Sequence, residues 1–449
     1  MKKFQLSKQN ERIVYMGRTM EESSWGWTQF PRLFAMKNGN IGLSIHDDDD
    51  AVISIGEECK KWMTSSDGGK SWREATKEEV DMMGTVLPNG EVLRPRSNPL
   101  VSLKDVEFDY PAWIWAARIP TSGEMPPKST DPKKMPFPLT VYGDVWKRHI
   151  FVYWMDTIPN SLIESRFRFS RLYEGDTEAK LEYSEVDWKY RTAYVFPPNH
   201  VTKTDLEKAM IAGLGLSDPC IRLAEDGSLY IADYFLHSAN PETGLYRGFT
   251  EVFIFRSTDN GKTWKQHGYI PYHPDEEKDA FAYLRHGYDE PSIEFMPDGS
   301  MLCILRTCDV DFGAPGWGPT YLSRSTDGGK TWSTPKYFQD RGALPHLLQL
   351  KNGVTLAVIT RPGIYVYASN DCGETWTECV EVMTGEDRSG LANHDCTPAN
   401  FHQWEGSCCN TSIYPLADNK ALLAFSDFYI PDENGIKHKG IKTVEIVVK

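Results

Sequence analysis

The chain has 449 residues, a formal net charge of −14 at pH 7 and aromatic side chains at 12% of its positions. This charge disfavours nucleic-acid binding, because phosphate contacts need a surplus of Lys and Arg, whereas a small anion needs only a local group of arginines. No apolar run approaches the roughly 18 residues of a membrane span, and the basic N-terminal segment lacks the apolar stretch of an export signal. We therefore expect a cytoplasmic protein.

The cysteines bear on metal and cofactor binding. Nine of them are scattered along the chain without C-x-x-C spacing, so neither a disulfide framework nor a metal site is indicated. The sequence predicts no cofactor.

A Pro followed seven residues later by Asn-Gly or Asp-Gly recurs along the chain. Each of these dipeptides joins two apolar runs, which is the strongest short-range signal for a β-hairpin. The four copies are Pro31 with Asn38-Gly39, Pro219 with Asp226-Gly227, Pro291 with Asp298-Gly299, and Pro345 with Asn352-Gly353.

A second motif, Ser-x-Asp-x-Gly-x-Ser/Thr-Trp, also occurs four times, at residues 65–72, 257–264, 325–332 and 369–376. It predicts a turn whose Gly takes a positive φ, whose Asp accepts hydrogen bonds from amides of its own turn, and whose Trp packs against a neighbouring hairpin. We interpret these boxes as structural clamps that take no part in a reaction.

Together the two motifs define a repeated unit of four strands, covering about 27–75, 216–268, 289–336 and 342–380. Segments 83–190 and 409–449 are degenerate copies, and a strand near residues 12–16 would complete the last one. Repeated four-stranded units are typical of β-propellers. The sequence therefore predicts an all-β, six-bladed β-propeller with four-stranded antiparallel blades.

The predicted propeller is one domain, 1–449, with an irregular insertion around 95–215. Seven blades are possible if 83–215 holds two. Thr204 and Glu207 have the spacing of a capping box, which predicts a short helix inside the insertion.

Polar side chains collect where the apolar strands begin and end. If all the Asn-Gly and Asp-Gly turns lie on one face, the start of each first strand and the end of each second strand meet on the opposite face. The strand starts are Asp218 and Glu290, with Phe30 and Leu344 at the same place in other units, and the strand ends are His46, Asp47, Tyr234, Arg306, Arg361, Ser426 and Asp427. The arginines suggest an anionic ligand, and the carboxylates suggest acid/base catalysis. We expect His346 to be a packed strand residue.

The four boxes resemble the Asp-box (BNR) repeats of the sialidase (neuraminidase) superfamily, whose fold is a six-bladed propeller. This resemblance implies an arginine triad for the substrate carboxylate, a Tyr nucleophile activated by a Glu, and an Asp acid/base. The segment from Glu290-Pro291-Ser292 to Arg306 looks like the one that supplies the Glu and the second arginine, and Arg361 looks like the third.

At two positions the chain departs from the superfamily pattern. Gln29 occupies the position at which the resemblance implies the first arginine. Arg32 is three positions farther along, so on a regular strand its side chain would face the opposite side from Gln29. The register of the nucleophile falls on Asn410; Tyr288 and Tyr414 are nearby but out of register. The Asp acid/base could be any carboxylate among Asp47 to Asp50, Glu57 and Glu58.

The leading functional hypothesis is a sialidase-like glycoside hydrolase that cleaves a terminal acidic sugar of the sialic or uronic acid type. An inverting route with two carboxylates is as open as a retaining one. The predicted catalytic residues are Glu290, Asp47, His46 and Asp218, and the predicted substrate-binding residues are Arg306, Arg361, Arg32, Tyr234 and Tyr288.

Two alternatives stay open. One is a polysaccharide or oligosaccharide lyase acting on a uronic acid, in which an arginine neutralises the carboxylate and His46 or Tyr234 takes the adjacent proton. The other is a non-catalytic sugar-binding propeller. In each case the expected partner is an acidic oligosaccharide or glycoside, with no nucleic acid or membrane partner.

Overall fold

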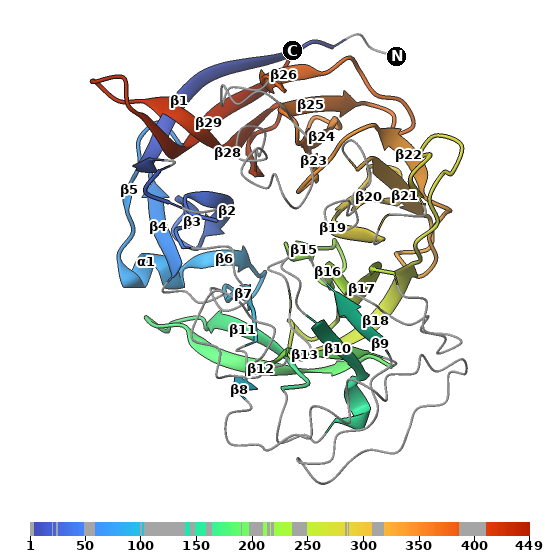
Figure 1. The fold of residues 1–449 in the computed structure, drawn as a ribbon. Coiled ribbons are helices and arrows are strands. Elements are labelled where there is room, and N and C mark those ends of the chain that lie inside the picture. Colours follow the sequence, from blue (N-terminus) through green and yellow to red (C-terminus); the bar gives the residue numbers. More distant parts are fainter. Residues whose placement is uncertain are drawn as a thin grey trace.

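The computed structural model describes residues 4–19, 21–23, 26–48, 59–98, 101–102, 140–143, 149–158, 164–189, 191–196, 210–212, 216, 220–235, 249–282, 285, 287–307, 318–385 and 410–449. Within them the regular secondary structure is almost entirely β-strand, and the antiparallel sheets follow one another around a common centre (Figure 1). The predicted all-β class is confirmed.

Consecutive strands pair in groups of four. Three such groups are joined edge to edge into a twelve-stranded sheet, through β2 with β6 and through the parallel pair β12 and β18. Its strands are β2 (Gln29–Met36), β3 (Ile41–His46), β4 (Lys60–Ser65), β5 (Arg73–Glu74), β6 (Met83–Val86), β7 (Val92–Arg96), β11 (Phe167–Leu172), β12 (Lys180–Asp187), β15 (Arg222–Leu223), β16 (Leu229–Phe235), β17 (Glu251–Ser257) and β18 (Thr263–Ile270).

Three further groups of four are separate sheets. Their strands are β19 (Tyr288–Phe295), β20 (Met301–Thr307), β21 (Thr320–Ser325) and β22 (Lys336–Gln339); β23 (His346–Gln349), β24 (Thr355–Thr360), β25 (Ile364–Ser369) and β26 (Val380–Met383); and β27 (Thr411–Ala417), β28 (Lys420–Pro431), β29 (Lys437–Val448) and β1 (Leu6–Thr19). In the last group the N-terminal strand β1 pairs with β29, as the degenerate final unit predicted. The two ends of the chain are therefore held in one sheet.

Part of the predicted insertion, 95–215, forms a separate five-stranded sheet, whereas its strands β11 and β12 belong to the twelve-stranded sheet. The five-stranded sheet is built from β8 (Val101–Ser102), β9 (Thr140–Gly143), β10 (His149–Trp154), β13 (Thr192–Phe196) and β14 (Met210–Ala212), with a 3-10 helix at Met155–Thr157. The aromatic segment 149–154 thus belongs to this extra sheet and not to the group of β6 and β7, which takes β11 and β12 instead. The predicted helix at 204–207 lies outside the described residues. A capping box of Thr76 and Glu79 does begin the short helix α1 (Lys77–Asp81).

The four boxes form the predicted turns. In the third, the Asp327 carboxylate accepts hydrogen bonds from the backbone N–H and the hydroxyl of Thr331, at 2.9 and 2.6 Å, and the Trp332 indole N–H donates to Gly329 O at 3.0 Å. Gly329 has φ +87°, and the matching glycines of the other boxes are also positive. The Asp carboxylate stabilises its own turn, which confirms the structural interpretation.

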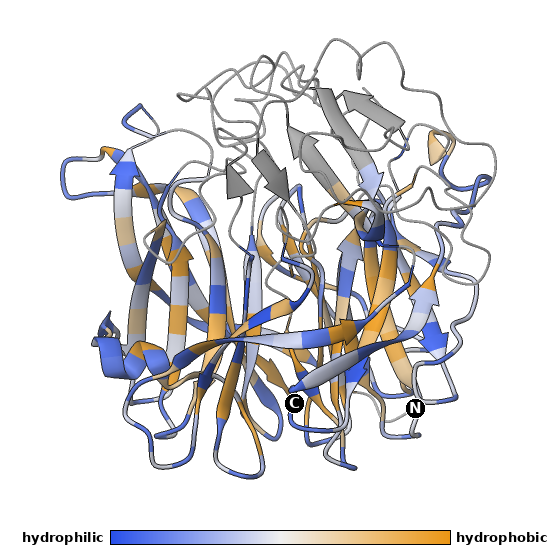
Figure 2. Ribbon diagram, turned by 90° about the horizontal axis from the view of Figure 1, so that it is seen from below, coloured by the Kyte–Doolittle hydropathy of each residue, from blue (hydrophilic) through white to orange (hydrophobic). Residues whose placement is uncertain are grey.

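Each box also contacts the preceding group of strands. Tyr230 donates its hydroxyl to Gly328 O of the next group's box, and the Arg171 guanidinium donates to Asn260 O at 2.8 Å. Trp264 is 1% exposed and stacks on Phe169 at 5.6 Å between ring centroids. The side view in Figure 2 shows hydrophobic residues along the strands and mainly hydrophilic residues at the turns on one face. The boxes therefore hold neighbouring sheets together.

The first strands of successive groups pack side by side around the centre, β19 against β23, β23 against β27 and β27 against β2. The residue after each Pro, or at the matching position, links one first strand to the next. Ser292 Oγ accepts from Leu347 N at 3.1 Å, His346 Nε2 lies 2.7 Å from Thr411 O, and Ser412 Oγ accepts from Leu33 N at 3.0 Å. These bonds join each first strand to the next around the centre. The bond of His346 to Thr411 O explains why this side chain is packed, as predicted.

Candidate active site

The predicted meeting of strand starts and strand ends is observed. Gln29 at the start of β2 pairs with His46 at the end of β3, and Asp289 in β19 pairs with Arg306 in β20. The register then shifts in both hairpins, between Gln29 and Arg32 and between Asp289 and Ser292. Such a bulge redirects the side chains around it.

Glu290 lies in one of these bulges, with φ +45°. Its Oε2 is 2.8 Å from Nη1 of Arg306 and accepts a 2.6 Å hydrogen bond from the backbone N–H of Leu344. Asp289 Oδ1 lies 3.8 Å from Nε of the same arginine. The structure therefore brings together Glu290 and Arg306, which sequence spacing had paired.

The electrostatics of this cluster keep Glu290 ionised. Burial acts to raise the pKa of the Glu290 carboxyl, but Arg306, the Leu344 N–H and Arg361 together hold that pKa below its usual range. Arg306 and Arg361 are both buried at 6% exposure, so little water weakens their fields. At neutral pH Glu290 is a carboxylate, which can accept a proton but not supply one.

Gln29 and Asn410, the two positions that depart from the sialidase pattern, are in direct contact. Asn410 Nδ2 donates a 2.8 Å hydrogen bond to Gln29 Oε1. Both side chains are buried, at 0% and 1% exposure. A neutral amide pair therefore lies on the face where strand starts and strand ends meet, which we call the rim.

The bulge in β2 places Arg32 opposite Ser44, two residues before His46, so Arg32 faces the same side of the strand pair as Gln29. Because of the bulge in β2, its guanidinium acts on His346, and burial together with Arg32 lowers the pKa of His346 to about 4. The expectation that Arg32 faces the other side assumed an unbroken strand, and the bulge changes that register. His346 is neutral at physiological pH.

Arg222 is a central residue that the sequence did not single out. Its Nε donates to Ile293 O at 2.9 Å and its Nη2 donates to Leu347 O at 3.1 Å, so it links β15 to β19 and β23. It also lies 3.3 Å from Glu294. Nothing in the local sequence marks it, because its partners are backbone carbonyls of distant strands. Within the described residues, Arg306 and Arg361 act on Glu290, whereas Arg32 and Arg222 act on His346.

His46 is the last residue of β3, and Asp47 follows it. Asp47 accepts a 3.1 Å hydrogen bond from the Thr28 hydroxyl and lies 3.4 Å from Lys61 Nζ. His46 contacts Phe30 edge to face, with ring centroids 5.9 Å apart. Both residues are thus held by neighbours at the strand end where the sequence placed them.

The predicted tyrosines differ in their surroundings. Tyr288 is fully buried and donates its hydroxyl to His273 O at 3.0 Å, so it has no exposed surface for a substrate in this structure. Burial raises its pKa. Tyr234, at the end of β16, is partly exposed. Asp218, Asp49, Asp50, Glu57 and Glu58 lie outside the described residues.

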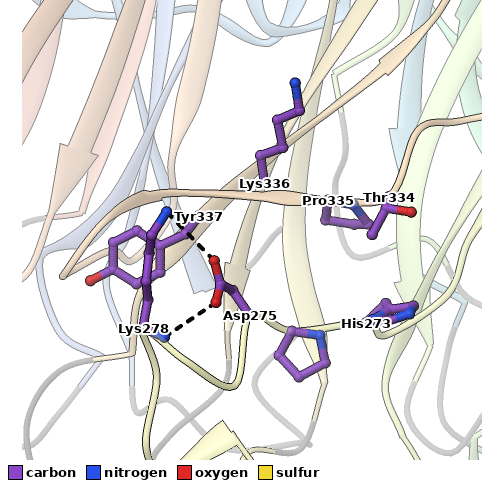
Figure 3. Close-up of a pocket in the computed structure, with 8 residues that line it drawn as sticks. His273, Asp275, Lys278, Thr334, Pro335, Lys336 and Tyr337 are labelled. Atoms are coloured by element: carbon purple, nitrogen blue, oxygen red, sulfur yellow. Dashed lines mark hydrogen bonds and ion pairs between the residues drawn. The ribbon is translucent and has the colours of Figure 1, made fainter.

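A separate pocket of about 380 Å³ lies at the outer strand β22, away from the centre. Figure 3 shows Lys278 and Asp275 paired beside the Tyr337 ring, with His273 across the opening. Its lining contains none of the predicted site residues.

Among the described residues, no group of three or more His, Cys, Asp or Glu could hold a metal ion. No helix in the same part of the chain has the length and apolarity needed to cross a membrane.

Comparisons with known proteins agree on the fold. The BNR/Asp-box repeat family matches residues 255–266, and no curated protein sequence matches the chain. A protein of unknown function from Dyadobacter fermentans aligns over 99% of both chains, with 15% identity and a TM-score of 0.51.

Two solved enzymes are less similar. The Penicillium chrysogenum alpha-L-arabinanase complexed with arabinobiose has 13% identity and a TM-score of 0.45, over 97% of this chain and 98% of that one. The NanB sialidase from Streptococcus pneumoniae has 12% identity and a TM-score of 0.44, over 98% and 70%. At such identities the likeness concerns the fold alone. The comparisons thus show an Asp-box repeat at residues 255–266 and a fold shared with the Dyadobacter fermentans protein.

Proposed function

We propose that this chain is a glycoside hydrolase that binds a terminal acidic sugar at the centre of the ring. The observation that carries the proposal is the contact of Glu290 with Arg306, beside Arg361. Guanidinium groups offer a planar fork to a carboxylate and stay charged at any physiological pH. Two buried guanidinium groups at this place favour an anionic ligand, although the chain as a whole is acidic.

Glu290 suits the role of general base. Because its pKa is held low, it is ready to take a proton from a water molecule that attacks the anomeric carbon. The bond to the leaving oxygen then breaks, and that oxygen takes a proton from an acid on the other side of the sugar, for which Asp47 is our candidate. Thr28 and Lys61 would orient Asp47. This route inverts the anomeric configuration.

A retaining route through tyrosine is less favoured by this site. Asn410 stands where the superfamily resemblance implies the nucleophile, and it is bonded to Gln29. Tyr288 is buried in the core. The inverting reaction uses two carboxylates with a water between them and needs no tyrosine. It is therefore consistent with Asn410 at the position of the nucleophile and with the burial of Tyr288.

The proposal includes a closed, six-bladed architecture. The four-stranded groups, the separate sheet of the insertion and the pairing of β1 with β29 support it. A ring closed in this way would place the first strands, which carry Glu290, Arg32 and His346, around one axis.

The test is a screen of acidic glycosides and oligosaccharides, read both by reducing-sugar release and by ultraviolet absorption. We expect new reducing ends without an absorbing product. Glu290→Gln should lower kcat by about 10²–10⁴, the usual contribution of a general base, and Arg361→Ala should raise KM. Glu381→Gln, on the exposed side of β26, is the matched control. Full turnover by Glu290→Gln would contradict the assignment.

A lyase acting on a uronic acid is the second candidate. The observation in its favour is the position of His46 at the rim, against Phe30, where its imidazole could take the proton next to a carboxylate that the arginines neutralise. An absorbing, unsaturated product formed without new water-derived hydroxyl groups would replace the first proposal with this one.

A further inference from the structure

Three side chains reach the rim by the same backbone conformation. Phe30, Glu290 and Leu344 have φ values of +48°, +45° and +40°, and each directly precedes a Pro. Each is partly exposed, whereas the residue before it is buried: Gln29 at 0%, Asp289 at 5% and Ala343 at 1%. The same turn of the backbone thus presents one side chain from each of three first strands.

This conformation is costly for any residue other than glycine. Backbone strain of this kind persists where the surrounding structure enforces it, and it is concentrated at functional sites. At Glu290 the consequence is visible, because the bulge delivers the carboxylate to Arg306. Phe30 and Leu344 have the same backbone conformation before the same residue type, Pro.

The contacts of the two apolar residues place them beside the charged cluster. The backbone N–H of Leu344 donates to the Glu290 carboxylate, so Leu344 borders the carboxylate directly. The Phe30 ring lies against His46, and its neighbour Gln29 bonds to Asn410. The strands are arranged in the order β19, β23, β27 and β2. The arginine-bound anion would therefore have Leu344 near it and Phe30 farther along the rim.

We propose that Phe30 and Leu344 are specificity-determining residues that contact an apolar group of the acidic substrate. The inference rests on the proposed function, because it takes the arginine cluster as the place where the carboxylate binds. It specifies the ligand as an acidic sugar that carries or is linked to an apolar group, as opposed to a small inorganic anion. Apolar contact at the rim stabilises such a ligand by removing its surface from water.

Glycine substitution separates this role from a structural one. Phe30→Gly and Leu344→Gly remove the side chain, yet glycine adopts a positive φ readily, so the bulge and Glu290 stay in place. We expect each variant to raise the KM and Kd of 4-nitrophenyl glycosides of sialic and glucuronic acid about tenfold, equivalent to about 1.4 kcal/mol. The value of kcat, the acid limb of the pH profile and the midpoint of thermal unfolding should change little. Binding of inorganic phosphate, measured by calorimetry, should stay the same.

Phe30→Tyr and Leu344→Met keep an apolar body at each position and should restore wild-type KM. If the glycine variants bind and hydrolyse the aryl glycosides as the wild type does, this inference is wrong and the proposed function stands. Binding of the aryl glycosides by the wild type without any cleavage contradicts the proposed function, while the Kd values of the glycine variants still decide the role of Phe30 and Leu344. Failure of the wild type to bind any of these glycosides contradicts both.

Discussion

Asn410 Nδ2 donates a 2.8 Å hydrogen bond to Gln29 Oε1, between two side chains that are 381 positions apart in the chain. Each residue stands where the sialidase resemblance implies a reactive or charged group. Sequence spacing identified the two replacements separately, and the structure shows that they are one feature. An arginine or a tyrosine at one position would leave the other amide without this bond, so we interpret the two replacements as coupled.

A double-mutant cycle tests this coupling. Gln29→Ala or Asn410→Ala should each lower the free energy of unfolding by about 1–3 kcal/mol, because each leaves a buried polar group without its amide partner. The double variant should lose less than the sum, with a coupling of about 1 kcal/mol in denaturant unfolding. Strict additivity would mean that the bond contributes nothing to stability.

The pH dependence of activity should show how strongly Arg306 lowers the pKa of Glu290. Glu290 acts as a carboxylate, so kcat/KM falls as the pH drops through its pKa, which lies below the usual Glu value of about 4.3. Arg306→Met removes the largest attraction that holds this pKa down, so the acid limb moves to higher pH. The loss of kcat/KM should therefore be greater at about pH 4 than at about pH 7. Arg324→Met, a half-buried arginine paired with Asp298 and Glu374, should leave the limb unchanged.

The boxes should differ in their contribution to stability. Trp264→Ala removes a fully buried ring stacked on Phe169, which should cost about 3–5 kcal/mol. Trp332 occupies the same position of another box but is only half-buried, so Trp332→Ala should cost less. Thermal unfolding of the two variants provides the comparison, and equal losses would show that burial of the ring is not the stabilising factor.

Arg222 should matter more than its place in the sequence suggests. Arg222→Met leaves the carbonyls of Ile293 and Leu347 without their donor and Glu294 without its cation. We expect a loss of about 1–3 kcal/mol in unfolding free energy together with a lower kcat, because β19 carries Glu290. Arg256→Met, at a half-exposed ion pair with Asp226 in the same group of strands, is the control and should change neither quantity by much. An unaltered Arg222→Met protein would show that the three strands hold their positions without it.

The all-β class and the repeated hairpins were predictable from the sequence because their signals are local. Asn-Gly and Asp-Gly turns join strands only a few residues away, and each box completes its hydrogen bonds within five residues. Spacing within one hairpin likewise paired Glu290 with Arg306. The segment 149–154 was assigned to the wrong sheet because an apolar strand does not specify which distant strand it pairs with.

What the sequence by itself determined, then, is the repeated hairpin, the box turn and the register that selects Glu290, Arg306 and Arg361. Only the tertiary structure decided where Arg32, Arg222, Gln29 and Asn410 meet their partners, and that Phe30 and Leu344 share the conformation of Glu290. The reason is physical: turns are specified by the conformational preferences of adjacent residues, whereas bulges and contacts between first strands depend on how separate sheets pack around the centre.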